Sequence, residues 1–141
     1  MIVITGGAGF IGSTLAKTLL NQELIIIDTF KDIEQRIYLT EILGARLVSL
    51  KDCKSILNYF KNDIKYFYHL GANSSTDQTI LNEAVDSNIF WSQFYWDFCT
   101  NNKIPFMYAS SAATYGDGAK GFSDKMTIDE LNNIKIHNVY G

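Results

Sequence analysis

The chain is 141 residues long, with 47% hydrophobic and 19% charged residues and a formal net charge of −3. This length and composition fit one ordinary domain, or part of a larger one, with a buried core. The acidic balance argues against binding to nucleic acid or to a membrane surface, since both need a basic patch. There is no membrane-spanning apolar run and no basic leader before the first glycines, so we expect a soluble cytoplasmic protein.

Apolar runs alternate with helical spacings along the chain. The sequence predicts strands and helices in the order 2–4 (strand), 10–20 (helix), 24–28 (strand), 31–43 (a weaker helix), 45–50 (strand), 52–61 (helix), 64–70 (strand), 79–100 (helix) and 104–109 (strand). After Ser111 the chain becomes rich in loops, with a polar stretch over 123–135. Buried strands that alternate with helices predict an α/β fold, a doubly wound parallel sheet of about five strands.

A glycine-rich segment, TGGAGFIG at residues 5–12, follows the first predicted strand and opens the first predicted helix. Gly7, Gly9 and Gly12 satisfy G-x-G-x-x-G, and Gly6 adds a second glycine spacing. Glycines here allow a tight turn, close approach of a pyrophosphate and packing of the helix on the strand. The helix N-terminus offers free N–H groups to phosphates. The segment therefore predicts a dinucleotide site in a Rossmann-type fold.

Asp28 ends the second predicted strand and lies 19 residues beyond Gly9, close to the expected spacing of about 20. Its carboxylate would accept hydrogen bonds from a ribose 2′-hydroxyl, which favours NAD. Lys31 and Arg36 follow closely and could instead hold the 2′-phosphate of NADP, or could be solvated helix charges. The choice between NAD and NADP stays open on this pattern.

The two cysteines, Cys53 and Cys99, match no metal-ligand spacing. We expect both to be reduced, packed thiols, and we expect no metal site. His69 stands at the end of a predicted strand, where a structural role is more plausible than that of a base.

Three later segments carry a more specific pattern. They are HLGANSST at 69–76, IPFMYASSAATYGDG at 104–118 and NVYG at 138–141. Together with the glycine-rich segment, they resemble the extended short-chain dehydrogenases/reductases, and within these the ADP-L-glycero-D-manno-heptose 6-epimerases. The resemblance runs over the whole chain but covers less than half of such an enzyme.

The resemblance implies a set of site residues. Ser111 would be a catalytic hydroxyl donor beside the reacting carbon, and Tyr140 would be the catalytic tyrosine of Y-x-x-x-K. The positions implied for the cofactor are Gly6, Gly7, Gly9, Phe10, Ile11, Gly12, Asp28, Thr29, Lys31, Gln35, Arg36, Gly71, Ala72, Asn73, Ser74, Ser75 and Asn88. Those implied for the substrate are Ser74, Ser75, Thr76 and Ser111.

The family reaction implied is a redox-neutral epimerisation in lipopolysaccharide inner-core precursor synthesis. NADP, with NAD as the alternative, takes hydride from C6 of ADP-heptose, the oxidised sugar turns, and the hydride returns to the other face. The resemblance also implies that the full-length enzyme is a homo-oligomer. A lysine lowers the tyrosine pKa so that it can act as a base, and that lysine would fall beyond Gly141. We therefore expect residues 1–141 to be an incomplete dinucleotide-binding domain that lacks the substrate domain and is inactive by itself.

Two other functions remain open at this point. The chain could come from a different nucleotide-sugar enzyme, such as a hexose 4-epimerase or a 4,6-dehydratase, or it could be a non-catalytic dinucleotide-binding module. Two departures from the family pattern matter here. Ile136-His137 replaces a Pro-Leu pair, and Gln35, with Arg36 beside it, stands where a lysine is common. The second departure leaves the preference for NADP unsettled.

Overall fold

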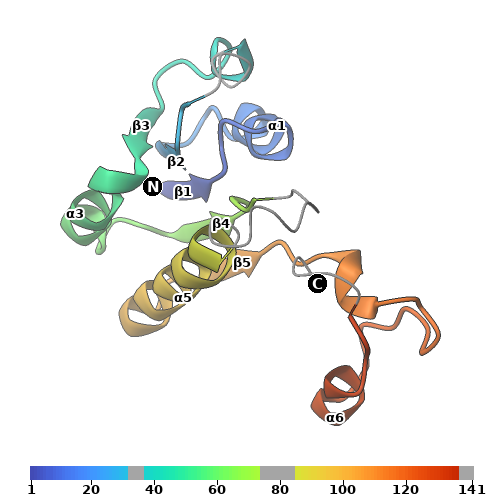
Figure 1. Cartoon of the computed structure of the whole chain (residues 1–141). Coiled ribbons are helices and arrows are strands. Elements are labelled where there is room, and N and C mark those ends of the chain that lie inside the picture. The colour runs from blue at the N-terminus through green and yellow to red at the C-terminus, as the bar shows by residue number, and fades with distance from the viewer. Residues whose placement is uncertain (32–36, 74–84, 137–141) are drawn as a thin grey trace.

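The structure is a computed structural model that describes residues 1–31, 37–73 and 85–136 (Figure 1). The strands are β1 (Ile2–Thr5), β2 (Leu24–Asp28), β3 (Arg46–Ser49), β4 (Tyr66–His69) and β5 (Phe106–Tyr108). The helices are α1 (Phe10–Thr18), α3 (Leu50–Phe60), α5 (Trp91–Asn102) and α6 (Ile128–Asn132), with the π-helical turn η2 (Val85–Phe90) and the 3₁₀ turn η3 (Ala112–Tyr115).

The five strands form one parallel sheet in the order β3-β2-β1-β4-β5. The chain runs outward from β1 to β3 and then returns across the sheet to β4 and β5. The carboxyl ends of β1 and β4 therefore meet in the middle of one edge, where the strand order reverses and ligands bind in folds of this class. The predicted doubly wound parallel sheet is confirmed.

The two faces of the sheet bury alternate residues of the same strands. Val3, Ile25 and Ile27 face a core shared with α3 and α5, whereas Ile4 and Ile26 face a core shared with α1. All five side chains are fully buried. Successive side chains of a strand point to opposite faces of the sheet, and here both faces are buried. The sequences of β1 and β2 are therefore continuous hydrophobic runs, and helices cover both faces of the sheet.

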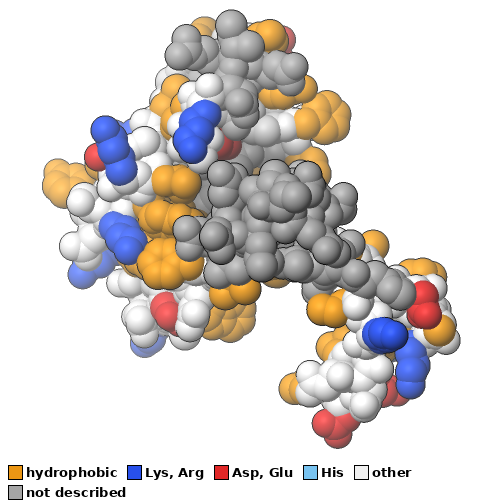
Figure 2. Space-filling model, in the orientation of Figure 1, with side chains coloured by type: hydrophobic (Ala, Val, Ile, Leu, Met, Phe, Trp, Pro, Cys, Tyr) orange, Lys and Arg blue, Asp and Glu red, His pale blue; other side chains and the backbone are white. Residues whose placement is uncertain are grey.

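An aromatic cluster covers the outer surface where α3 meets η2 and α5. The Lys54 ammonium lies 5.2 Å from the ring centre of Phe90, 5.5 Å from Trp91 and 5.0 Å from Phe94. Figure 2 shows hydrophobic side chains gathered on this face of the molecule beside Lys and Arg side chains. The cluster closes the core around Tyr95, which is 1% exposed. It thereby holds α5 against the sheet.

Several boundaries differ from those predicted from the sequence. The predicted helix over 31–43 is helical at 37–39, with 32–36 outside the described residues, and then gives way to turns. The N–H of Ile42 bonds to the carbonyl of Leu39, three residues back, and Ile42 is still buried. A turn thus buries the apolar positions that suggested a helix. Residues 85–90 of the predicted helix over 79–100 are π-helical, and 79–84 lie outside the described residues.

The segment after β5 leaves the sheet and ends in a short helix that was not predicted from the sequence. Residues 123–135 were expected to be loop, but 128–132 form α6. Thr127 caps this helix by accepting the N–H of Glu130, whose carboxylate accepts the N–H of Thr127 in return. Figure 1 shows η3 and α6 extending away from the sheet. The pattern T-x-x-E was the available signal for this helix start.

Candidate functional site

The glycine-rich turn between β1 and α1 lies against the chain that follows β4. Gly6 has a φ of +66°, and a Cβ at this position would lie 2.6 Å from Cα of Gly71. A Cβ on Gly12 would lie 2.7 Å from Cα of Gly7 and would clash with the carbonyl oxygen of Gly6. Only glycine fits at these two positions, because one needs a left-handed backbone and both lack space for a side chain.

The turn exposes backbone donors at the start of α1. The N–H of Ser13 bonds to Gly9 and that of Gly9 bonds to Gly6. The N–H groups of Phe10 and Ile11 have no acceptor within the described residues, and the side chains of both are about 70% exposed. Free N–H groups at a helix N-terminus, beside a backbone that excludes side chains, fit the pyrophosphate of a dinucleotide. The cradle therefore fits the cofactor that the sequence pattern predicts.

Asp28 ties the glycine-rich turn to the end of β2. One carboxylate oxygen accepts the N–H of Ala8 at 3.0 Å, and the other accepts the N–H of Thr29 at 2.7 Å. Thr29 and Lys31 continue from this point as exposed residues. The sequence pattern predicts a ribose contact for Asp28, and the structure shows in addition its bond to the turn. Gln35 and Arg36 lie outside the described residues.

Thr5, His69 and Ser92 link the centre of the sheet to α5. Thr5 Oγ1 lies 2.6 Å from Nδ1 of His69 and accepts the N–H of Gly71 at 3.1 Å. The other ring nitrogen of His69, Nε2, lies 2.7 Å from Oγ of Ser92. His69 is 2% exposed, and burial lowers its pKa to about 4. The imidazole is therefore neutral near pH 7, in line with the structural role expected for it.

Asn88, in the π-helical turn η2, holds the chain that follows β4. Its side-chain oxygen accepts the N–H of Asn73 at 2.7 Å, and its side-chain nitrogen donates to the carbonyl of Asn73 at 2.9 Å. The side-chain amide thus bonds to both the N–H and the carbonyl of one residue, as the backbone of a neighbouring strand would. These two bonds fix the loop over Gly71, Ala72 and Asn73. The family resemblance implies a role for Asn88 in binding the cofactor. The structure adds that its amide positions the loop over Gly71, Ala72 and Asn73, which the resemblance also assigns to the cofactor.

We predict that Asn88→Ala frees this loop without unfolding the sheet. Each lost bond is worth about 1 kcal/mol, so exchange of the Asn73 amide hydrogen should become at least about tenfold faster. Hydrogen exchange followed by NMR measures this effect. Asn102→Ala is the matched control, because the Asn102 amide bonds to the carbonyl of Phe98 in its own helix. Equal exchange rates at Asn73 in the two variants would contradict the role given to Asn88.

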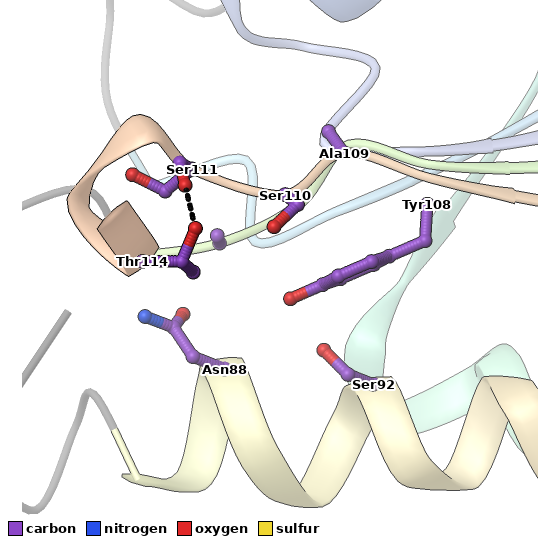
Figure 3. A pocket seen from close by; sticks show the side chains of 8 residues that line it. Asn88, Ser92, Tyr108, Ala109, Ser110, Ser111 and Thr114 are labelled. Carbon is purple, nitrogen blue, oxygen red and sulfur yellow. Dashed lines mark hydrogen bonds between the residues drawn. The ribbon is translucent and has the colours of Figure 1, made fainter. Parts of the chain in front are cut away.

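A small pocket of about 80 Å³ opens between the end of β5 and the helix formed by η2 and α5 (Figure 3). Its lining residues are Ala72, Asn88, Ser92, Tyr108, Ala109, Ser110, Ser111 and Thr114. Ser111 Oγ accepts the N–H of Ala113 at 3.1 Å, so its own hydrogen remains to be donated. The Thr114 hydroxyl donates to the Ser111 carbonyl at 2.6 Å and fixes the turn.

The structure thus brings three of the predicted site residues, Ala72, Asn88 and Ser111, into one pocket at the carboxyl edge of the sheet. Four others, Ser74, Ser75, Thr76 and Tyr140, lie outside the described residues.

Sequence reasoning missed Ser92 and Tyr108 as residues of this pocket. Ser92 lies four residues after Asn88, on the same helix face, and this spacing was a usable signal.

Three further features of the described residues bear on the sequence predictions: metal sites, the two cysteines and membrane-spanning helices. No group of three or more histidine, cysteine or acidic side chains within residues 1–31, 37–73 and 85–136 is arranged to hold a metal ion. Cys53 and Cys99 are both free and buried, as predicted, and burial raises the pKa of both thiols. Of the helices in the described parts of the chain, none has the length and hydrophobicity needed to cross a bilayer.

Comparison with known proteins gives consistent results. The family model described as "NAD dependent epimerase/dehydratase family" matches residues 2–141. An ADP-L-glycero-D-manno-heptose-6-epimerase of Fusobacterium nucleatum subsp. nucleatum is 34% identical over all of this chain and 44% of its own length. The chain thus spans less than half of that relative.

Solved structures agree on the fold. A UDP-glucuronic acid 4-epimerase of Bacillus cereus, in complex with NAD, has a TM-score of 0.70 at 25% identity, over 82% of this chain and 41% of that one. A UDP-N-acetylglucosamine 4-epimerase of Methanobrevibacter ruminantium has a TM-score of 0.66 at 27% identity, over 99% of this chain and 44% of that one. With a glycine cradle at the strand crossover and a family match along nearly its full length, the chain belongs to the NAD dependent epimerase/dehydratase family.

Proposed function

We propose that residues 1–141 form the dinucleotide-binding domain of a cytoplasmic nucleotide-sugar epimerase that acts at C6 of ADP-heptose, with NADP as the cofactor. The observation that carries the proposal is the position of Ser111. This residue lines a pocket at the carboxyl edge of the sheet, next to the loop that Asn88 holds and on the same edge as the glycine cradle. The 34% identity to a heptose epimerase supports the choice of substrate.

The described residues would divide the binding of the cofactor and the sugar between them. The free N–H groups of Phe10 and Ile11 would hold the pyrophosphate, and Asp28 would keep the turn in place. Asn88 would fix the loop over Gly71, Ala72 and Asn73, whose residues would contact the cofactor. A bound nicotinamide dinucleotide supplies a hydride acceptor that is regenerated within each cycle. The Ser111 hydroxyl would donate to the sugar oxygen, on which negative charge develops. Tyr140 is proposed to take the proton from this sugar oxygen and to return it later in the cycle.

Ligand binding to the complete enzyme proposed here, with its substrate domain, tests this proposal. We expect NADP⁺ and ADP-heptose to bind, and UDP-glucose to bind more weakly than ADP-heptose. Isothermal titration of NADP⁺, NAD⁺ and the two sugar nucleotides measures all four affinities. Tighter binding of UDP-glucose would overturn the choice of substrate and favour a UDP-sugar 4-epimerase, because the two solved relatives are named UDP-glucuronic acid 4-epimerase and UDP-N-acetylglucosamine 4-epimerase. Tighter binding of NAD⁺ would overturn the choice of NADP.

We predict that Ser111→Ala weakens ADP-heptose binding about tenfold, because one hydrogen bond to the sugar is lost. NADP⁺ affinity should stay within about twofold of the wild type. Ser111→Thr, which keeps the hydroxyl and the cap on η3, should bind ADP-heptose nearly normally. Ser55→Ala, on the exposed surface of α3, serves as the matched control. Unchanged ADP-heptose affinity in Ser111→Ala would remove Ser111 from the site.

A further inference from the structure

Four hydrogen-bonding groups behind the pocket form one continuous chain. It begins at the N–H of Gly71, passes through the hydroxyl of Thr5 and the imidazole of His69, and ends at the hydroxyl of Ser92. The first three groups lie at the ends of β1 and β4, and the fourth lies on α5, where it lines the pocket. The direction of each hydrogen in this chain decides what Ser92 offers to a ligand.

The direction is set at Thr5. The N–H of Gly71 can only donate, so Thr5 Oγ1 accepts there and its single hydroxyl hydrogen remains to be placed. Thr5 is 2% exposed, and within the described residues Nδ1 of His69 is the other group bonded to its oxygen. A buried hydroxyl hydrogen without an acceptor carries the full penalty of its lost hydration. The Thr5 hydrogen therefore points to Nδ1.

This direction fixes the tautomer of His69. A neutral imidazole that accepts a hydrogen bond at Nδ1 carries its own hydrogen on Nε2. The Nε2–H then donates to Oγ of Ser92 at 2.7 Å. Because this bond occupies the Ser92 oxygen as an acceptor, the hydroxyl hydrogen of Ser92 must point away from His69.

The pocket lies on that other side of Ser92. Figure 3 shows the Ser92 and Tyr108 hydroxyl oxygens pointing into the same gap between α5 and the end of β5. No described residue accepts the Ser92 hydrogen. The polar side chains among the lining residues are hydroxyls and the Asn88 amide, and none of them carries a charge. Walls of this kind complement the uncharged oxygens of a sugar rather than a phosphate or a carboxylate.

We propose that Ser92 is a fixed hydrogen-bond donor of the pocket, that His69 is the positioning residue that sets its direction, and that an uncharged sugar oxygen is its acceptor. The assignment of a sugar oxygen as the acceptor rests on the proposed function. Tyr108 supports the arrangement, because its ring stacks on the imidazole with centres 5.6 Å apart and planes 26° apart. His69 is thus held in its plane by a residue of the same pocket.

The tautomer is tested by the ¹⁵N and ¹H shifts of the imidazole at pH 7. The chain has two histidines, so His137→Gln leaves His69 as the sole signal. We expect a protonated Nε2 and an unprotonated Nδ1. Thr5→Val should shift the population toward the Nδ1–H form, whereas Thr5→Ser should keep the wild-type shifts. An Nδ1–H form, or an exchanging mixture, in the chain with Thr5 intact would overturn the proposal.

The donor is tested by titrating ADP-heptose and NADP⁺ into Ser92→Ala and Ser92→Thr. We expect Ser92→Ala to bind ADP-heptose about tenfold more weakly and NADP⁺ normally, with Ser92→Thr close to the wild type. Wild-type ADP-heptose affinity in Ser92→Ala would overturn the role of Ser92 and leave the proposed function standing. A wild-type enzyme, complete with its substrate domain, that binds NADP⁺ but no ADP-heptose would overturn the proposed substrate, and the sugar acceptor with it.

Discussion

Gly6→Ala will destabilise the fold by about 2–5 kcal/mol, which is a large share of the stability of an ordinary domain. Two costs add at this position. A non-glycine residue at a φ of +66° costs about 1–2 kcal/mol. The new Cβ would also stand 2.6 Å from the Gly71 backbone and 2.8 Å from the carbonyl carbon of Leu70, and forcing β1 and β4 apart costs about 1–3 kcal/mol more. Urea unfolding followed by circular dichroism measures the loss.

Gly44→Ala is the matched control for this experiment. Gly44 has a φ of +86°, also in the left-handed region, but a Cβ there would have no atom within 4 Å. It isolates the cost of the backbone conformation, so a loss of about 1–2 kcal/mol is expected. Equal losses in the two variants would mean that the close approach of Gly6 to Gly71 contributes nothing to stability.

Acidification from pH 7 to pH 4 will lower the free energy of unfolding by about 3 kcal/mol through His69 alone. The pKa of His69 is about 4 in the folded protein and about 6.5 in the unfolded chain. The unfolded chain therefore binds more protons within this window, so the contribution is complete above pH 6.5 and is lost as the pH falls toward 4. Protonation of Nδ1 breaks the bond that this nitrogen accepts from the Thr5 hydroxyl, which is the structural counterpart of the loss.

Chemical denaturation at several pH values separates His69 from the carboxylates. His69→Gln removes the titrating group, so the free energy of unfolding of this variant should fall by about 3 kcal/mol less than that of the wild type between pH 7 and 4. His137→Gln should keep the wild-type dependence. The imidazole ¹⁵N shifts of the wild type provide a second measurement. A His69 that titrates near pH 6.5 would refute the assignment.

The sheet and the glycine turn could be predicted because their signals are local. Ile2 to Thr5 and Leu24 to Asp28 are short β-branched runs, and Gly6 to Gly12 follow the first run directly. The register follows because Ile2 pairs with Leu24 and Ile4 with Ile26 in successive buried strands. Helix boundaries were less certain. Ile42 kept its helical spacing but is buried by a turn, because burial constrains the position of a side chain and not the hydrogen bonds of its backbone.

The pocket was only partly predictable, because its geometry depends on contacts between distant parts of the chain. His69 bonds to Thr5, 64 residues earlier, and to Ser92, 23 residues later. Ser111 could be named through a family resemblance, but the resemblance did not place Ser92 or Tyr108 beside it. The π-helical turn that holds Asn88 has no signature in the apolar spacing of the helix. Such residues are found only when the fold brings them together.

The placement of the two cysteines makes them a built-in reporter of one face of the protein. Cys53 on α3 and Cys99 on α5 are at most 1% exposed, and both belong to the core between these helices and the sheet. The core on the α1 side contains neither of them. A thiol reagent can therefore react only when the α3–α5 layer lifts off the sheet. The labelling rate would follow the opening of that layer while α1 and the glycine turn remain closed.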